Sequence, residues 1–225
     1  MNKKPEGLSP FIDHTLLKPE ATHEQILHLC EEALKFEFFS VCVNSSYVST
    51  CAQFLKNSNV KVCSVVGFPL GAMNTLAKAY ETALAVKEGA HEIDMVLSIG
   101  ALKSKNYDYV LADIQAVVQA ARGATVKVII ETSLLNQEEK VLACQISERA
   151  GAHFVKTSTG FSGGGATLED IELMKKSCGP EMKIKASGGI KSSKQAWSLI
   201  AAGAHRLGTS SGVTLVQNEL STEGY

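Results

Sequence analysis

Short apolar segments rich in β-branched residues alternate along this chain with longer segments whose apolar residues recur at helical spacing. This alternation predicts a parallel sheet whose strands are joined by crossover helices. Eight strands are expected, at residues 11–15, 38–43, 61–66, 92–96, 126–131, 153–156, 182–185 and 204–207. Helices are expected at residues 22–35, 45–56, 75–88, 107–121, 137–149, 167–176 and 192–201, with a short one from residue 210.

Local signals at the segment boundaries support this division. Thr22 and Thr167 are each followed by acidic or amide residues, as at the start of a helix. The sequences EGAHEID, RAGAHFVK and AAGAHRLG repeat one device, in which a helix ends at Gly-Ala and the chain runs directly into a strand. Glycines follow the helical segments at four places: Gly89, Gly123, Gly151 and Gly203.

Eight strand–helix units predict an α/β fold of the (β/α)₈ barrel type, the TIM barrel, for which ~200–250 residues are usual. An open doubly wound sheet is the alternative. No G-x-G-x-x-G follows the first strand, and the glycine-rich segments come late in the chain, which favours the barrel. With 225 residues and 45% hydrophobic residues, we expect one domain over 1–225, with flexible tails at 1–9 and 220–225.

The charge balance bears on the partners. Lys and Arg number 22 and Asp and Glu 23, so the chain has no large field of one sign to attract nucleic acid or an anionic membrane. No apolar run has the length needed to cross a bilayer, and we expect a cytoplasmic protein. The six cysteines show no metal-ligand spacing and are expected to be reduced and mostly buried.

Ionisable residues stand in or at the end of three predicted strands. Asp94 lies within EIDMV, Lys156 closes HFVK, and Lys185 closes MKIK. In (β/α)₈ barrels the catalytic groups stand at the C-terminal ends of the strands. A single lysine there can be a solvated rim residue, but two on neighbouring strands, each followed by small residues and glycine, indicate one shared pocket. Glu92, on the same face as Asp94, is expected to be a core-side or rim carboxylate of lower interest.

Two neighbouring lysines suit imine chemistry. The ordinary lysine pKa of ~10.4 has to fall to roughly 7–8 for nucleophilic attack at neutral pH, which corresponds to about 4 kcal/mol. A second cation ~6 Å away supplies about 2.8 kcal/mol at an effective dielectric near 20, and desolvation can supply the remainder. One lysine can therefore activate the other. Which of the two attacks is left open, and Asp94 can be either a structural partner or a proton shuttle.

An anion site is predicted after the last two strands. Ser187, Gly188 and Gly189 follow the seventh strand, and Gly208 to Ser211 follow the eighth and open a short helix. Backbone N–H groups, hydroxyls and a helix N-terminus can bind phosphate without net positive charge. Either segment alone could be a plain turn or cap.

The six histidines form no metal-ligand spacing, and no metal is required. Four of them are expected to be hydrogen-bonded structural residues: His14, His91, His153 and His205.

The motifs FIDHTLLKP, SVCVN, VVGFPLGA, EIDMVLSIGALK, VKVIIET, FVKTSTGF, KASGGI and GTSSG occur in this order across nearly the whole chain. Together they resemble the deoxyribose-phosphate aldolase family, which are class I (Schiff-base) aldolases. The resemblance implies a carbon–carbon lyase that reversibly cleaves 2-deoxy-D-ribose 5-phosphate to D-glyceraldehyde 3-phosphate and acetaldehyde in deoxynucleoside breakdown. It implies no cofactor, and phosphosugar and aldehyde as the small-molecule substrates.

The resemblance also assigns roles. It implies that Lys156 forms the Schiff base, that Lys185 lowers its pKa, and that Asp94 relays protons. The implied substrate and phosphate contacts are Gly188, Gly189, Ser210 and Ser211, with Gly160 and Gly208 as additions and Asp13, Thr15 and Cys42 lining the pocket wall.

The chain departs from some relatives at Phe161, where they place a lysine after TSTG, so one cationic phosphate contact is missing. It ends in Tyr225, which matches relatives whose terminal tyrosine reaches the active site, although a terminal aromatic can equally remain in solvent.

Two alternatives stay open. One is another phosphosugar Schiff-base aldolase or a transaldolase-like barrel, which donor specificity would distinguish. The other is a non-catalytic barrel that binds a phosphorylated metabolite; it would keep the glycine loops but would need neither lysine. A homo-oligomer, a dimer or a tetramer, is expected.

Overall fold

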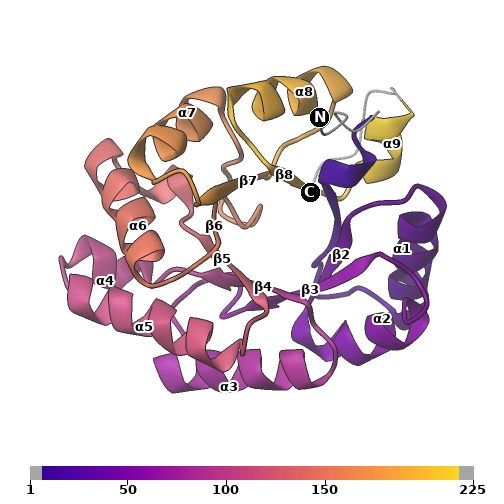
Figure 1. Cartoon of the computed structure of the whole chain (residues 1–225), viewed down its shortest axis with the longest axis horizontal. Coiled ribbons are helices and arrows are strands. Elements are labelled where there is room, and N and C mark those ends of the chain that lie inside the picture. The colour runs from indigo at the N-terminus through magenta and orange to yellow at the C-terminus, as the bar shows by residue number, and fades with distance from the viewer. Residues whose placement is uncertain (1–6, 218–225) are drawn as a thin grey trace.

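The computed structural model describes residues 7–217. Eight parallel strands close into one barrel, each paired with its neighbours in chain order, and β8 returns to pair with β1. The (β/α)₈ prediction is confirmed, and the closing pair excludes an open sheet. Figure 1 shows the helices surrounding the barrel. The strands are β1 (Ile12–Leu16), β2 (Ser40–Val43), β3 (Lys61–Val66), β4 (Glu92–Val96), β5 (Thr125–Ile129), β6 (Phe154–Lys156), β7 (Lys183–Ser187) and β8 (Arg206–Thr209).

Several helices begin at the residues whose side chains the sequence marks as caps. Thr22 forms a capping box with Gln25, and Thr167 accepts a hydrogen bond from the Asp170 N–H. The helices are α1 (His23–Lys35), α2 (Val48–Phe54), α3 (Thr75–Lys87), α4 (Ile99–Lys103), α5 (Tyr107–Ala120), α6 (Gln137–Arg149), α7 (Leu168–Ser177), α8 (Ser193–Ala202) and α9 (Gly212–Val216), with 3₁₀ turns η1 (Ser9–Phe11), η2 (Ser45–Tyr47) and η3 (Thr132–Leu134).

The repeated Gly-Ala-His device joins neighbouring strands. The Nδ1 atoms of His91, His153 and His205 accept hydrogen bonds from backbone N–H groups of β3, β5 and β7, at 3.1, 3.0 and 3.2 Å. Each histidine precedes its own strand and so fixes the start of that strand against the preceding odd-numbered one. The predicted structural role of these histidines is confirmed.

Several boundaries differ from the expectation, among them the starts of β2 at Ser40 instead of residue 38 and of α2 at Val48 instead of residue 45. The helix α4 was not predicted, because its five residues are too few to show a helical period. Strand β5 ends at Ile129 instead of residue 131, since Glu131 turns into a left-handed conformation with φ 53°. Strands β7 and β8 each run two residues further than predicted, which places Lys185 in the middle of β7 and Gly208 inside β8.

Among residues 7–217, no helix combines the length and apolar character that a membrane crossing requires.

Candidate active site

Seven charged side chains fill the inside of the barrel. All are at most 5% exposed, although buried charges are rare unless they are paired. They come from six of the eight strands, so that residues far apart in the sequence meet on the barrel axis. We call them the charge cluster: Asp13, Glu92, Asp94, Lys127, Lys156, Lys185 and Arg206.

Asp94 lies at the centre of the charge cluster. Its Oδ2 accepts hydrogen bonds from Lys156 Nζ and Lys185 Nζ, both at 2.8 Å. Its Oδ1 accepts from Lys127 Nζ at 2.7 Å and from the Cys63 thiol at 3.1 Å. One carboxylate therefore holds three ammonium groups in a fixed relation to one another.

The other two carboxylates, on β1 and β4, complete the cluster. Asp13 contacts Lys185 Nζ at 2.5 Å and accepts from Arg206 Nε at 2.9 Å. Glu92 contacts Lys127 Nζ at 2.8 Å and Arg206 Nη2 at 2.9 Å. The Arg206 guanidinium thus bridges two carboxylates, in the forked geometry that suits it.

Mutual pairing decides the ionisation of the cluster. Burial opposes the charged form of Asp94, but the three ammonium groups around it hold the pKa of this carboxyl well below its ordinary range. Burial likewise opposes charge on Asp13, whose pKa Arg206 and Lys185 lower. Burial would lower the pKa of Lys185, yet Asp13 and Asp94 raise it well above its ordinary value. The pKa of Lys127 is also raised, mainly by Asp94 against the effect of burial.

The cations of the cluster are not equally paired. Lys127, Lys185 and Arg206 each contact two carboxylates, whereas Lys156 contacts only Asp94 and shares that oxygen with Lys185. The Lys156 side chain is 3% exposed, while those of Lys127 and Lys185 are fully buried. Four cations face three carboxylates, so one positive charge has no counter-charge within the cluster.

Lys127 and Arg206 were not predicted, and Glu92 was expected to be of lower interest. Glu92 and Arg206 stand at the starts of their strands and Lys127 in the middle of its strand, away from the C-terminal ends where catalytic groups are expected. A signal was available: Lys127 interrupts the apolar run TVKVI just as Asp94 interrupts EIDMV, and the two are direct partners across β4 and β5. Opposite charges inside two neighbouring buried strands predict an ion pair.

Two predicted wall residues lie beside the cluster. Thr15, Cys42 and Cys63 are paired in register across β1, β2 and β3. The sulfur atoms of Cys42 and Cys63 and a carboxylate oxygen of Asp94 lie within 4.8 Å of one another, a spacing that a metal ion could bridge. Lys127 Nζ already contacts both Cys63 and Asp94, so an ammonium group supplies the positive charge at this place.

The predicted anion-binding segments meet at the C-terminal end of the barrel. Gly188 and Gly189 have φ of 88° and 72°, a left-handed conformation that glycine adopts without steric cost. Thr209 Oγ1 donates to Ile190 O at 3.2 Å and accepts from the Ser211 N–H at 3.0 Å, which ties the segment after β8 to the segment after β7. Gly160, with φ 86°, belongs to the loop after β6.

Gly208 has a different position from the expected loop. It lies inside β8, and a Cβ there would come within 2.9 Å of Ser187 Cβ and 3.0 Å of Lys185 Cε. The absence of a side chain at Gly208 therefore makes room for Lys185.

Phe161, which stands where some relatives have a lysine, packs edge-on against Phe68 with ring centroids 5.2 Å apart. Tyr225 lies outside the described residues.

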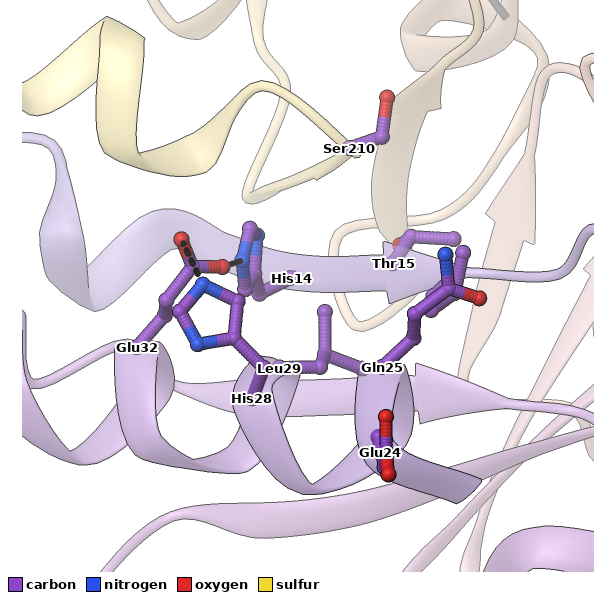
Figure 2. Close-up of a pocket in the computed structure, with 9 residues that line it drawn as sticks. His14, Thr15, Glu24, Gln25, His28, Leu29, Glu32 and Ser210 are labelled. Carbon is purple, nitrogen blue, oxygen red and sulfur yellow. Dashed lines mark hydrogen bonds and ion pairs between the residues drawn. The ribbon is translucent and has the colours of Figure 1, made fainter. Parts of the chain in front are cut away.

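A separate hollow of about 430 Å³ lies outside the barrel wall, between β1 and α1. Figure 2 shows His14 pointing from β1 toward Glu32 on α1, and His14 Nε2 and Glu32 Oε2 are 2.7 Å apart. Ser210 also lines this hollow and is exposed. The hydrogen-bonded structural role expected of His14 is confirmed, since it joins a strand to its helix on the side away from the charge cluster.

Comparison with known proteins gives consistent matches over almost the whole chain. A family model described as DeoC/LacD family aldolase matches residues 10–220. The deoxyribose-phosphate aldolase of Bdellovibrio bacteriovorus is 66% identical over 97% of this chain and 99% of its own length, and that of Streptococcus sanguinis is 57% identical with the same coverage. The tetrameric deoxyribose-phosphate aldolase from Aeropyrum pernix superposes with a TM-score of 0.87 at 35% identity, covering 93% of this chain and 89% of that one.

Proposed function

The chain belongs to the DeoC/LacD family of aldolases, and from this premise we propose that it reversibly cleaves 2-deoxy-D-ribose 5-phosphate to D-glyceraldehyde 3-phosphate and acetaldehyde through a Schiff base on Lys156. The reaction makes it a carbon–carbon lyase of deoxyribose phosphate catabolism. The names of its relatives support this substrate, and the charge cluster supports the chemistry.

One observation carries the assignment of Lys156. An excess positive charge is costly in a buried site, and release of one proton leaves three cations against three carboxylates. Lys156 has the fewest carboxylate contacts of the three lysines, and its side chain is the only one of the three with any exposure, so it is the lysine that a substrate can reach. The uncharged amine is the nucleophile that imine formation needs.

Asp94 and Lys185 then have defined roles in the reaction at Lys156. Neutral Lys156 adds to the aldehyde carbon of the open-chain sugar, and loss of water gives an iminium ion that withdraws electrons from the bond between C2 and C3. A water molecule held by Asp94 and Lys185 accepts the proton of the C3 hydroxyl and passes one to the Asp94 carboxylate, the bond breaks, and an enamine of acetaldehyde remains on Lys156. Protonation and hydrolysis release acetaldehyde.

The phosphate group is assigned to the C-terminal end of the barrel. The turn at Gly188 and Gly189 and the hydroxyls of Ser210 and Ser211 follow the last two strands there, with Gly160 on the neighbouring loop. Such groups bind a dianion without a nearby lysine, which matters because Phe161 supplies no cation. Asp13, Thr15 and Cys42 complete the wall below the substrate.

Borohydride trapping tests the proposal directly. The protein is incubated with acetaldehyde or with deoxyribose 5-phosphate and reduced, and the adduct is located by peptide mass mapping. An adduct on Lys156, absent from Lys156→Ala, is the expected result. An adduct on Lys185, or bound phosphosugar without any adduct, would contradict the assignment. A trapped dihydroxyacetone unit in place of acetaldehyde would move the protein to a different aldolase activity.

We also infer that the protein acts as a homo-oligomer in the cytoplasm. The solved relative from Aeropyrum pernix is described as tetrameric. In this chain three large apolar side chains recur every fourth residue on one face of α3 and remain exposed: Leu76, Tyr80 and Leu84. An exposed apolar stripe of this kind indicates a contact surface.

A further inference from the structure

Glu131 is a buried carboxylate outside the charge cluster that the mechanism above does not use. It is 1% exposed and stands just beyond β5, beside the end of β6. Its two chain neighbours extend the ladder between these strands: the Ile130 N–H donates to Lys156 O and the Thr132 N–H to Thr157 O, both at 2.9 Å. Glu131 therefore lies directly next to the residues that follow the proposed Schiff-base lysine.

The backbone of Glu131 has an unusual conformation for a residue with a side chain. Its φ of 53° lies in the left-handed region, where glycine has no steric cost and other residues do. Three other non-glycine residues in the described chain share a positive φ, namely Glu37, Lys105 and Arg122, and all three are exposed. Among the described residues, only Glu131 combines this conformation with a buried side chain, and this combination points to a task that glycine could not perform.

The contacts of the carboxylate identify that task. Glu131 Oε2 accepts from the Thr159 N–H at 3.1 Å, from the Thr159 hydroxyl, and from the Ser162 hydroxyl at 3.3 Å. All three donors belong to the loop between β6 and α7, residues 157–167, which contains Gly160. Thr159 Oγ1 in turn accepts from the Phe161 N–H at 3.1 Å, so the first half of this loop is organised around one carboxylate.

The second half of the same loop packs on the turn after β7. The Ala166 N–H donates to Gly188 O at 3.0 Å, and a Cβ on Gly165 would lie 2.5 Å from that oxygen. The loop also lies against the segment after Glu131, since a Cβ on Gly164 would be 2.4 Å from Ser133 Cβ. A displacement of the β6–α7 loop would therefore be transmitted to Gly188 in the proposed phosphate site.

We propose that Glu131 is a positioning residue that fixes the β6–α7 loop and, through it, the turn at Gly188 and Gly189, and so sets the preference for phosphorylated over unphosphorylated substrate. This inference rests on the proposed function, because it takes the turn as the phosphate site. It assigns Glu131 no contact with the reacting atoms, and predicts that imine formation at Lys156 does not depend on it.

The test uses Glu131→Gly, which removes the carboxylate while keeping a residue that accepts a positive φ. The matched control is Glu37→Gly, which makes the same change at an exposed residue with φ 54°. Loss of hydrogen bonds to a charged acceptor is expected to raise KM for deoxyribose 5-phosphate by at least ~10-fold in Glu131→Gly. Borohydride trapping of acetaldehyde on Lys156 should stay at the level of the wild type, and Glu37→Gly should change neither quantity.

Two results would overturn the inference. One is an unchanged KM for the phosphorylated substrate. The other is an equal loss of acetaldehyde trapping and of phosphosugar turnover in a folded variant, because that would place Glu131 in the chemistry. If Glu131→Gly does not fold, Thr159→Val replaces it; this variant removes the hydroxyl bonded to Glu131 and should raise KM in the same direction. Absence of trapping in the wild type would instead contradict the proposed function, so the two failures are distinguishable.

Discussion

Lys156 differs from the other cations of the charge cluster in having a single carboxylate contact. The excess positive charge of the cluster, in turn, depends on Lys185. With Lys185 present, four cations face three carboxylates and one proton is in excess. With Lys185 removed, three cations match three carboxylates, so the cluster no longer carries an excess positive charge. The activating effect of one lysine on the other is thus a property of the charge count of the whole cluster.

Replacement of Lys185 by Leu should therefore lower kcat/KM by ~100-fold or more at neutral pH, the range of effects seen when an essential charge is lost. Lys183→Gln, an exposed lysine two residues earlier on β7, is the control. A Lys185→Leu variant with wild-type kcat/KM would refute this account.

Ser211 tests the phosphate site at the level of a single side chain. It follows β8, and its N–H is held by Thr209 Oγ1 at 3.0 Å. A carboxylate introduced by Ser211→Glu would repel the phosphate dianion, so KM for deoxyribose 5-phosphate should rise ~10-fold or more while trapping of acetaldehyde remains. Ser211→Gln has a similar size without the charge and should have a smaller effect. If both variants bind the phosphosugar like the wild type, Ser211 does not belong to the site.

The helices outside the barrel are fixed by buried polar contacts as well as by apolar packing. Lys78 on α3 is fully buried and donates to Asp113 Oδ2 on α5 at 2.6 Å and to Val96 O at the end of β4 at 3.0 Å. Asp113 also accepts from Thr75 Oγ1 at 2.7 Å. This pair joins two helices to the strand that carries Asp94.

Replacement of Asp113 by Ala should destabilise the fold by about 3–5 kcal/mol, because it leaves the Lys78 ammonium group buried without its counter-charge. The measurement is the free energy of unfolding in urea. Lys78→Met combined with Asp113→Leu removes both charges and should recover most of the loss. Lys103→Ala, at a pair in which the lysine is 45% exposed, should leave the free energy within error. An Asp113→Ala variant as stable as the wild type would show that the pair contributes nothing.

The elements that could be predicted from sequence are those with a local cause. Capping residues and terminal glycines mark helix ends, and the Gly-Ala-His device marks three strand starts. The helix α4 could not be predicted, because five residues show no period. The left-handed conformation of Glu131 also has no local signal, since it depends on a loop about thirty residues later in the chain.

The site could be predicted in part for the same reason. Asp94, Lys156 and Lys185 could be found because each interrupts or follows an apolar strand near small residues. Arg206 required the register of the closed barrel, which places it at the start of β8 and among the buried charges. Lys127 interrupts an apolar strand as Asp94 does, and its role follows from its register opposite Asp94. The selection of Lys156 from the residues alone was impossible, because it depends on how many carboxylates each cation contacts.

The charge cluster also makes the stability of the whole molecule depend on pH. The pKa of Asp94 is lower in the folded than in the unfolded protein, so its contribution to stability is present above its ordinary pKa of ~3.9 and is lost as the pH falls below it. The pKa of Lys185 is raised on folding, so its contribution is present below the ordinary lysine value of ~10.4 and is lost as the pH rises above it. The cluster thus favours the folded state most between these limits.

Comparison of wild type and Asp94→Asn in urea at several pH values measures this effect. The variant should be clearly less stable at pH ~7, and the difference should shrink as the pH falls toward ~3, where the carboxylate of the unfolded wild type is protonated. Asp108→Asn, at an exposed position on α5, should show no such pH-dependent difference. A difference between wild type and Asp94→Asn that is constant with pH would show that charge pairing is not its cause.

The exposed apolar face of α3 concerns the assembly of the molecule. Leu76 is 79% exposed and Tyr80 is 72% exposed, which costs free energy in a monomer in water and stabilises an oligomer in which a second copy covers them.

Leu76→Glu combined with Tyr80→Glu should convert the oligomer to a monomer, as measured by light scattering coupled to size-exclusion chromatography. Leu168→Glu is the control; Leu168 is 43% exposed on α7, which Figure 1 shows on the other side of the barrel from α3. Since the charge cluster lies inside one barrel, the monomeric variant should still form the acetaldehyde adduct on Lys156. A monomeric wild type, or an oligomer that survives both substitutions, would exclude α3 as the interface.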